Sequence, residues 1–206
     1  MTEPTSVLAK AWEQVDAVGG RIAEWEPQVV LITGAGPVGL LAALIGVQRG
    51  LEIHVFDRVT DGRKPALVRE LGATYHGGSL DDLELEPDVV IECTGAGSVV
   101  FDVASHTGPT GVTCLTGLSP AGRKLDVDVA LLNRSLVLEN GALVGSVNAN
   151  QRHYEAAAAA LERADRHWLQ RLITRTVPIA SFQDALHREP EDVKVVLDFR
   201  DLSHAH

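Results

Sequence analysis

Cysteine is scarce in this sequence, and the patterns that mark a disulfide-rich or membrane protein are absent. The two cysteines, Cys93 and Cys114, lie inside apolar runs, without a second Cys or His at metal-ligand spacing. We therefore expect buried thiols on strands rather than a disulfide framework or a metal site. No apolar run reaches the roughly 18 residues needed to cross a bilayer, and the first residues do not read as a secretory leader. These absences favour a reducing, cytoplasmic location and no membrane partner.

Positive charge is also in short supply. The 28 Asp and Glu residues against 18 Lys and Arg give a formal net charge of −10, which argues against nucleic acid as a general partner. With 45% hydrophobic and 22% charged residues, the 206-residue chain has the composition of a globular protein that buries a sizeable core. The length favours one large domain, or one domain with extensions.

One stretch organises the rest of the chain. A β-branched apolar run at 29–33 leads into Gly34-Ala35-Gly36-Pro37-Val38-Gly39, and an Ala/Leu-rich helical pattern follows. This G-x-G-x-x-G sequence between a strand and a helix is typical of a dinucleotide-binding turn. Gly34 would allow the tight turn, Gly36 would let a pyrophosphate approach the backbone, and Gly39 would let helix and strand pack closely. The positive end of the new helix would face the phosphates.

A second strand ending in an acid strengthens this interpretation. The run from Leu51 to Asp57 alternates as a strand, and Asp57 lies 18 residues after Gly39. That spacing is close to the roughly 20 residues expected for the acid that holds the adenosine ribose hydroxyls. An ordinary strand–turn–helix with a surface Asp is the competing interpretation. The combined pattern favours dinucleotide binding.

Which nicotinamide dinucleotide binds is open at this point. A carboxylate at Asp57 would accept hydrogen bonds from both ribose hydroxyls and repel a 2′-phosphate, which favours NAD. Arg58, Arg63 and Lys64 follow closely and could clamp that phosphate instead, or could form a solvated basic loop. The residues alone lean towards NAD.

The whole chain divides into three parts. Residues 1–27 predict a helix that Thr5 or Ser6 could cap and that Gly19-Gly20 should end. From 28 to 150, apolar strand runs alternate with helical runs, which indicates a doubly wound parallel sheet of about six strands, an α/β Rossmann fold. Within it, 135–147 is expected to supply the last strands. Residues 151–206 predict C-terminal helices and a final strand.

Loops at the ends of the predicted strands should line one crevice. In an open parallel sheet, ligands bind outside the carboxyl ends of the strands. The loops concerned are 34–39, 94–98 and 116–119, and the last two would meet the nicotinamide half of the dinucleotide. Turns favour Gly and Ser regardless of function, so a plain turn is the alternative for any single residue.

The catalytic half of a hydride-transfer enzyme is missing from the pattern. Such an enzyme needs a substrate pocket and usually an acid or a metal that manages the alcohol proton. The sequence has no His-Glu or Cys-His group at metal spacing, and neither Tyr75 nor Tyr154 has a lysine four residues later. Only the cofactor site can be read from the sequence.

From about residue 3 to 199, the chain resembles the C-terminal part of medium-chain zinc-dependent dehydrogenases, and most closely the archaeal-type glucose (aldose) dehydrogenases. Four motifs carry the resemblance: Glu3-Pro4-Thr5-Ser6, Gly34-Ala35-Gly36-Pro37-Val38-Gly39-Leu40, Glu92-Cys93-Thr94-Gly95 and Gly145-Ser146-Val147-Asn148-Ala149-Asn150. The first two are widespread in the superfamily, and the last is the most specific to the glucose branch.

The resemblance implies the cofactor-binding half of a glucose-type oxidoreductase, whose zinc-bearing catalytic domain has no counterpart here. It implies that Asn148 contacts the nicotinamide end, although Asn148 could equally cap the helix that follows. The resemblance favours NADP as the cofactor. It also implies homo-oligomers that pair through an edge strand, for which 136–138 and 142–144 are candidates. Together, residues and resemblance give these cofactor-binding candidates: Gly34, Gly36, Pro37, Val38, Gly39, Asp57, Arg58, Thr94, Gly95, Thr116, Gly117 and Asn148.

Two other functions stay open at this stage. The chain could be a non-catalytic NAD(P)-binding module or the partner subunit of a split dehydrogenase, because metal ligands and acid–base residues are missing. More weakly, it could be a self-sufficient reductase whose substrate enters the open crevice. In the favoured hypothesis an aldose is a substrate only together with a catalytic domain, and zinc would be bound only there.

Overall fold

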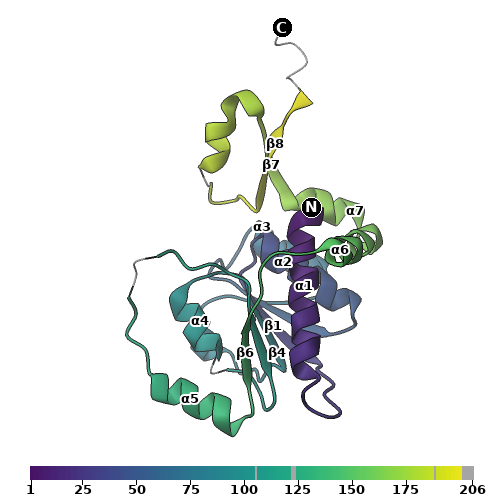
Figure 1. Ribbon diagram of the computed structural model, residues 1–206. Helices are drawn as coiled ribbons and strands as arrows, with labels where there is room; N and C mark the ends of the chain where they lie inside the picture. The colour runs from purple at the N-terminus through teal and green to yellow at the C-terminus, as the bar shows by residue number, and fades with distance from the viewer. Residues whose placement is uncertain (105, 122–123, 188, 201–206) are drawn as a thin grey trace.

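A computed structural model describes residues 1–104, 106–121, 124–187 and 189–200, except for the side chain of Asp81. The end of the predicted C-terminal segment, 201–206, therefore lies outside the described residues. Between residues 29 and 145, strands alternate with helical segments, as the sequence predicts, and form a parallel sheet with helices on both faces (Figure 1). The Rossmann-like α/β fold is confirmed.

The larger sheet has six strands, all parallel, in the order β3-β2-β1-β4-β5-β6. Its strands are β1 (Val29–Thr33), β2 (Glu52–Phe56), β3 (Thr74–His76), β4 (Val89–Glu92), β5 (Val112–Leu115) and β6 (Ala142–Gly145). The order reverses between β1 and β4, which is the point where a doubly wound sheet opens a crevice at the carboxyl ends of its strands. Both strands are almost entirely buried, as β-branched runs covered on two faces should be.

The helices cover the two faces of the sheet unequally. They are α1 (Thr2–Gly19), α2 (Pro37–Gln48), α3 (Arg63–Glu70), α4 (Gly97–Ala104), α5 (Val129–Leu138), α6 (Gln151–Arg163) and α7 (Arg166–Leu172). The main core lies between one face and the helices α1, α2, α3 and α7, and a smaller cluster fills the α4 face. Because α2 packs on the sheet and is flanked by α1, α3 and α6, it is apolar nearly all round, and Trp12 of α1 donates a hydrogen bond to the Ala42 carbonyl at 3.3 Å.

The N-terminal helix begins earlier than the sequence suggests. Thr5 and Ser6 do not cap it but lie buried within its first turns, where their hydroxyl groups donate hydrogen bonds to the carbonyl oxygens of Met1 and Glu3. Both buried hydroxyl groups therefore find hydrogen-bond acceptors inside the helix, as Ser and Thr often do there, and neither residue acts as the N-cap. The predicted end at Gly19 is confirmed.

The prediction of strands over 135–147 is wrong for its first part. Leu136, Val137 and Leu138 belong to α5, whose N-terminus is capped by the Asp128 carboxylate, and only β6 is a strand. An apolar triplet fits a helix as well as a strand, and the turn at Asn140-Gly141 separates the two elements rather than two strands. Only β6 of this stretch lies at the edge of the sheet.

The C-terminal part adds a second, two-stranded parallel sheet that the sequence did not fully indicate. It consists of β7 (Ile173–Pro178) and β8 (Lys194–Asp198), joined by a 3-10 helix over Ile179–Leu186, and it projects beyond α7 in Figure 1. Arg175 and Asp192 tie it together with a contact of 2.6 Å between Nη2 and Oδ2. Of the helices in the part of the chain that the structure describes, none is long and apolar enough to span a membrane.

Candidate functional site

The glycine turn lies where β1 passes into α2, at the reversal of strand order. A Cβ on Gly39 would lie 1.8 Å from the Gly34 carbonyl oxygen, so only glycine lets the helix approach the turn this closely. Gly36 is different, because a Cβ there would meet no atom of the chain within 4 Å. Gly36 precedes Pro37, the first residue of α2, and its own conformation is extended. The turn is therefore tight on its protein side and open on its other side.

Asp57 follows β2 directly and is tied to the glycine turn. Its Oδ2 accepts hydrogen bonds from the Ala35 N–H at 2.8 Å and from Lys64 Nζ at 2.9 Å, and its Oδ1 accepts one from the Val59 N–H at 3.2 Å. Burial alone would raise the pKa of Asp57, but the Lys64 and Ala35 hydrogen bonds outweigh it and lower that pKa. The carboxylate is thus held ionised at the edge of the crevice.

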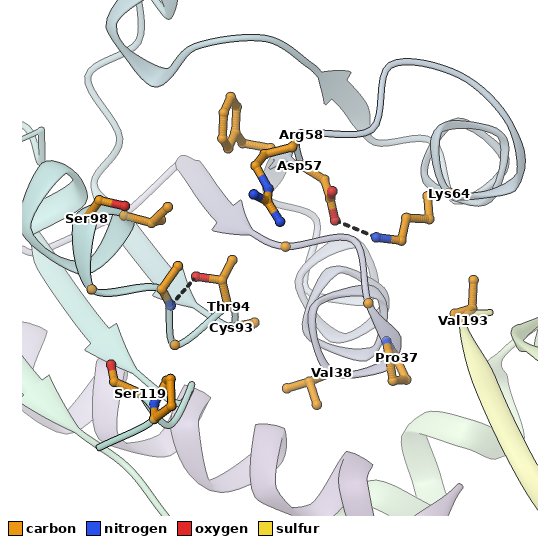
Figure 2. A pocket seen from close by; sticks show the side chains of 18 of the residues that line it. Pro37, Val38, Asp57, Arg58, Lys64, Cys93, Thr94, Ser98, Ser119 and Val193 are labelled. Atoms are coloured by element: carbon orange, nitrogen blue, oxygen red, sulfur yellow. Dashed lines mark hydrogen bonds and ion pairs between the residues drawn. The ribbon is translucent and has the colours of Figure 1, made fainter. Parts of the chain in front are cut away.

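Two cations flank this carboxylate in different ways. Lys64, at the start of α3, is only 8% exposed because its stem packs inside while its ammonium group reaches Asp57. Arg58 is exposed, and in Figure 2 its guanidinium group points over the cavity between Asp57 and the loop of Thr94. Asp57, Arg58 and Lys64 together carry one net positive charge at this end of the site.

A buried glutamate organises the other side of the crevice. Glu92, the last residue of β4, is fully buried, and its Oε1 accepts hydrogen bonds from the N–H groups of Thr94 at 2.6 Å and Gly95 at 3.0 Å, as well as from the Thr94 hydroxyl. Its backbone carbonyl accepts a hydrogen bond from the Thr116 hydroxyl at 2.7 Å. One residue therefore fixes the loops that follow β4 and β5.

Those two loops touch each other through glycines. A Cβ on Gly95 would overlap the backbone of Leu118, and a Cβ on Gly117 would overlap the backbone of Gly95. Gly95 also has a positive φ of 63°, which L side chains rarely adopt. The structure thus gives Gly95, Gly117 and Thr116 a role in packing the two loops together.

The turn and the loops surround one cavity of about 860 Å³, within the range of small-molecule and cofactor sites (Figure 2). Of the predicted residues, eight line it: Gly34, Gly36, Pro37, Val38, Asp57, Arg58, Thr94 and Gly95. The other four, Gly39, Thr116, Gly117 and Asn148, are not among its lining residues. The predicted crevice therefore forms from the loops that the sequence indicates. In the loop after β5, Ser119 lines the cavity, and Thr116 and Gly117 do not.

Asn148 lies further along the sheet edge, in the segment between β6 and α6. It is exposed and has a positive φ of 63°. It does not cap α6, as the alternative interpretation held, because that position is taken by Asn150, whose Oδ1 accepts a hydrogen bond from the His153 N–H.

Only one of the two thiols is buried on a strand, as was expected for both, and the other is partly exposed. Cys114 lies in β5 and is fully buried, whereas Cys93 follows β4 and contributes to the wall of the cavity. Burial raises the pKa of Cys93 to about 12 and that of Cys114 to about 11. Both are therefore neutral thiols at ordinary pH rather than reactive thiolates.

Reasoning from the sequence missed the role of Glu92, which holds the loops without lining the cavity, and several residues of the wall itself. Glu92 could have been found, since an acid that ends a buried apolar strand must have partners. Val193, just before β8, had no signal, because it lies 68 residues beyond Leu125, the nearest other wall residue in the sequence (Figure 2). No group of three His, Cys, Asp or Glu among the described residues could hold a metal ion, and Glu3 is exposed in the first turn of α1.

Comparison with known proteins connects this geometry to a family. The family model for the glucose dehydrogenase C-terminus matches residues 1–199. Glucose 1-dehydrogenase of Thermoproteus tenax is 40% identical over 96% of this chain, and glucose 1-dehydrogenase 2 of Vulcanisaeta moutnovskia is 37% identical over 96%. In both cases the match covers 58% of the relative's length.

A solved structure shows the same fold. Haloferax mediterranei glucose dehydrogenase, in complex with NADP, Zn and gluconolactone, superposes with a TM-score of 0.87 at 28% identity, over 96% of this chain and 58% of that one. The relatives thus contain a further part, about two fifths of their length, that the 206 residues do not match. The match to the family model spans nearly the whole sequence, and the chain belongs to the family of glucose dehydrogenase C-terminal domains.

Proposed function

We propose that this chain binds a nicotinamide dinucleotide along the carboxyl edge of its sheet and serves as the cofactor-binding part of a zinc-dependent glucose dehydrogenase. One observation carries the proposal: the open side of the glycine turn at Gly36 faces a cavity that runs from Asp57 to the loops after β4 and β5. The N-terminus of α2 offers free N–H groups to a pyrophosphate there. No atom of the described residues lies within 4 Å of a Cβ built on Gly36, which leaves the space that such a group needs.

In this proposal each part of the chain has a task. Residues 28–150 form the dinucleotide-binding unit, 1–27 the helix that joins it to a catalytic part, and 151–206 the C-terminal helices and strand. Bound nicotinamide would accept a hydride from C1 of an aldose. The residues of this chain orient the dinucleotide and exclude water from its pyrophosphate, and a zinc enzyme that uses this chain takes its zinc ligands from other residues.

The charges at the adenosine end favour NADP over NAD. Lys64 neutralises Asp57, so the carboxylate no longer repels a 2′-phosphate as a free one would, and Arg58 stands exposed beside it. This reverses the lean towards NAD that the sequence alone gives. A bidentate guanidinium–phosphate contact would provide the specificity.

Titration of the chain with NADPH and NADH, followed by nicotinamide emission, tests both parts of this proposal. We expect saturable binding, tighter for NADPH, and Arg58→Gln should weaken NADPH by about tenfold while leaving NADH unchanged, as the loss of one charge-assisted contact implies. An unchanged ratio of the two affinities would refute the role of Arg58. The absence of binding for either dinucleotide would refute the proposed function.

The proposal also includes pairing of two copies through β6. This strand has a neighbour on one side only, and α5, which precedes it, buries none of its residues and exposes Val129, Leu131, Val137 and Leu138 by more than half. A second copy that adds its own β6 would cover this apolar surface. Light scattering should give a dimer that Leu138→Glu weakens. A wild-type chain that stays monomeric at high concentration would refute the pairing.

A further inference from the structure

The segment between β6 and α6 extends the carboxyl edge of the sheet beyond the cavity. β6 is the next strand outward from β5, and the loop after β5 supplies Ser119 and Pro120 to the cavity wall. Within the segment, Asn148 is exposed, has a left-handed backbone, and its side chain makes no hydrogen bond among the described residues. Since Asp57 marks the adenosine end over β2, the other half of a dinucleotide would run over β4, β5 and β6. The segment therefore stands at the nicotinamide end.

Helix α1 holds this segment from a great distance in the sequence. Lys10 Nζ donates a hydrogen bond of 2.7 Å to the carbonyl oxygen of Val147, 137 residues away. One turn further on, Glu13 accepts a hydrogen bond of 2.6 Å from Arg152 Nη2. This contact, more than any other, lowers the pKa of Glu13, so the carboxylate stays ionised. Lys10 and Glu13 lie three residues apart, hence on one face of α1.

The same face of α1 meets the first turn of α6. His153 is 4% exposed, and its Nδ1 accepts a hydrogen bond of 3.0 Å from the Asn150 N–H. The ring proton must then be on Nε2, which lies 3.3 Å from Glu13 Oε2. This contact joins the buried ring of His153 to the carboxylate of Glu13. The turn 147–150 is thus fixed at one end by Lys10 and at the other by Asn150, His153 and Glu13.

We propose that Lys10 and Glu13 are positioning residues for the dinucleotide, which hold the turn 147–150 in place to contact its nicotinamide half. This inference rests on the proposed function. A turn that is already ordered does not have to be immobilised on binding, and affinity rises by the ordering free energy that is saved. The effect should be confined to the nicotinamide half, because the contacts of Asp57 and the glycine turn do not involve α1.

Three variants separate this role from general stability. Lys10→Met removes the donor and keeps the apolar stem, and Lys10→Arg keeps a donor. Lys194→Met is the matched control, since the ammonium group of Lys194 has no hydrogen bond or ion pair within the described part of the chain. Amide hydrogen exchange over 147–150 is measured without cofactor. Dissociation constants are measured for NADPH and for its adenosine half, 2′,5′-ADP.

We expect Lys10→Met to speed exchange at 147–150 and to weaken NADPH about three- to tenfold, the effect of one lost hydrogen bond. Its affinity for 2′,5′-ADP should not change, and Lys10→Arg and Lys194→Met should behave as the wild type. Unchanged exchange would refute the hold of Lys10 on the turn. Faster exchange with unchanged NADPH affinity, or an equal loss for NADPH and 2′,5′-ADP, would refute its positioning role. A wild-type chain that binds neither compound would refute the proposed function itself, and the inference with it.

Discussion

The two halves of the crevice are built by different means. The half over β1 and β2 depends on close backbone approach, because Gly39 packs against Gly34 and Asp57 reaches the Ala35 N–H. The half over β4, β5 and β6 depends on side chains that bridge distant segments, such as Glu92 between two loops and Lys10 on Val147. Apart from Val193, the first half is therefore built within 31 residues, 34–64, and the second half draws on segments from Lys10 to Val147.

Rigidity therefore has a different physical origin in each half of the crevice. Steric fit of glycines tolerates no added carbon, but it needs no partner from elsewhere in the chain. Long-range hydrogen bonds tolerate small changes of shape, but each one fails when either partner is lost. We expect variants in the first half to affect the fold itself, and variants in the second half to affect the loops and the binding of the nicotinamide end.

The largest expected effect is that of Gly39→Val. Its Cβ would overlap the Gly34 carbonyl oxygen, so α2 must move, and we expect a loss of about 3 kcal/mol in the free energy of unfolding. Gly145→Val, at the end of β6, is the matched control, since a Cβ there meets nothing within 4 Å and should change stability by less than about 0.5 kcal/mol. Urea denaturation measures both. Similar losses for the two variants would remove the contrast between the halves.

Glu92→Gln is expected to have the next largest effect. The amide oxygen could still accept from Thr94 and Gly95, but the charge that strengthens these hydrogen bonds is lost, and the amide N–H2 would face the Gly95 N–H in place of Oε2, at a total cost of about 2 kcal/mol. Glu162→Gln, on the exposed side of α6, should be neutral. Urea denaturation and NADPH titration would be compared. A stable Glu92→Gln with unchanged loops would show that glycine packing alone holds this half.

Asp57→Asn should give a smaller, pH-dependent loss. The pKa of Asp57 is lowered in the fold, so its contribution of about 1 kcal/mol is fully present above the carboxyl's unfolded value near 3.9 and is lost as pH falls through the lowered folded value. The difference in unfolding free energy between wild type and variant should be constant from pH 7 to about 5 and shrink below about 4. A difference that grows on acidification would contradict the assignment.

The smallest effect compares Asn150 with Asn148. Asn150→Ala removes the N-cap of α6 and should cost about 1 kcal/mol. Asn148→Gly should cost nothing in stability, because glycine adopts the positive φ at that position more readily than asparagine. Thermal denaturation distinguishes the two. A larger loss of stability for Asn148→Gly than for Asn150→Ala would contradict this assignment, because the Asn148 side chain would then stabilise the fold.

The sequence predicted the half of the site that is encoded locally. The strand, the glycine turn and Asp57 lie within 30 residues, so their spacing alone indicated that they meet. Within 34–64, every lining residue except Phe56 and Lys64 was named as a candidate from the sequence. Lys64 was considered only as a possible phosphate ligand. The alternation of elements indicated a doubly wound parallel sheet of about six strands, and the structure adds the order of those strands. The end of α5, residues 135–138, was predicted as a strand because its apolar triplet has no periodicity that excludes either structure.

What could not be predicted comes from tertiary contacts. Lys10 looks like a surface lysine in the sequence, and only the packing of α1 on α6 brings it to Val147. Val193 reaches the cavity because the second sheet folds back beside α3, where Gly62 lies near Glu191. Such contacts leave no trace in local spacing, because they depend on how separate elements pack.

The central claim is that the open side of Gly36 receives the pyrophosphate, and Gly36→Asp tests it most directly. Asp is favourable at an N-cap and meets no chain atom there, so the free energy of unfolding should not fall, whereas a carboxylate in the pyrophosphate position should abolish NADPH binding. Ala156→Asp, which adds the same charge on the exposed face of α6, should bind as the wild type does. Saturable NADPH binding by the wild type that is lost only in Gly36→Asp is the predicted result. A folded Gly36→Asp that binds NADPH with wild-type affinity would contradict the account.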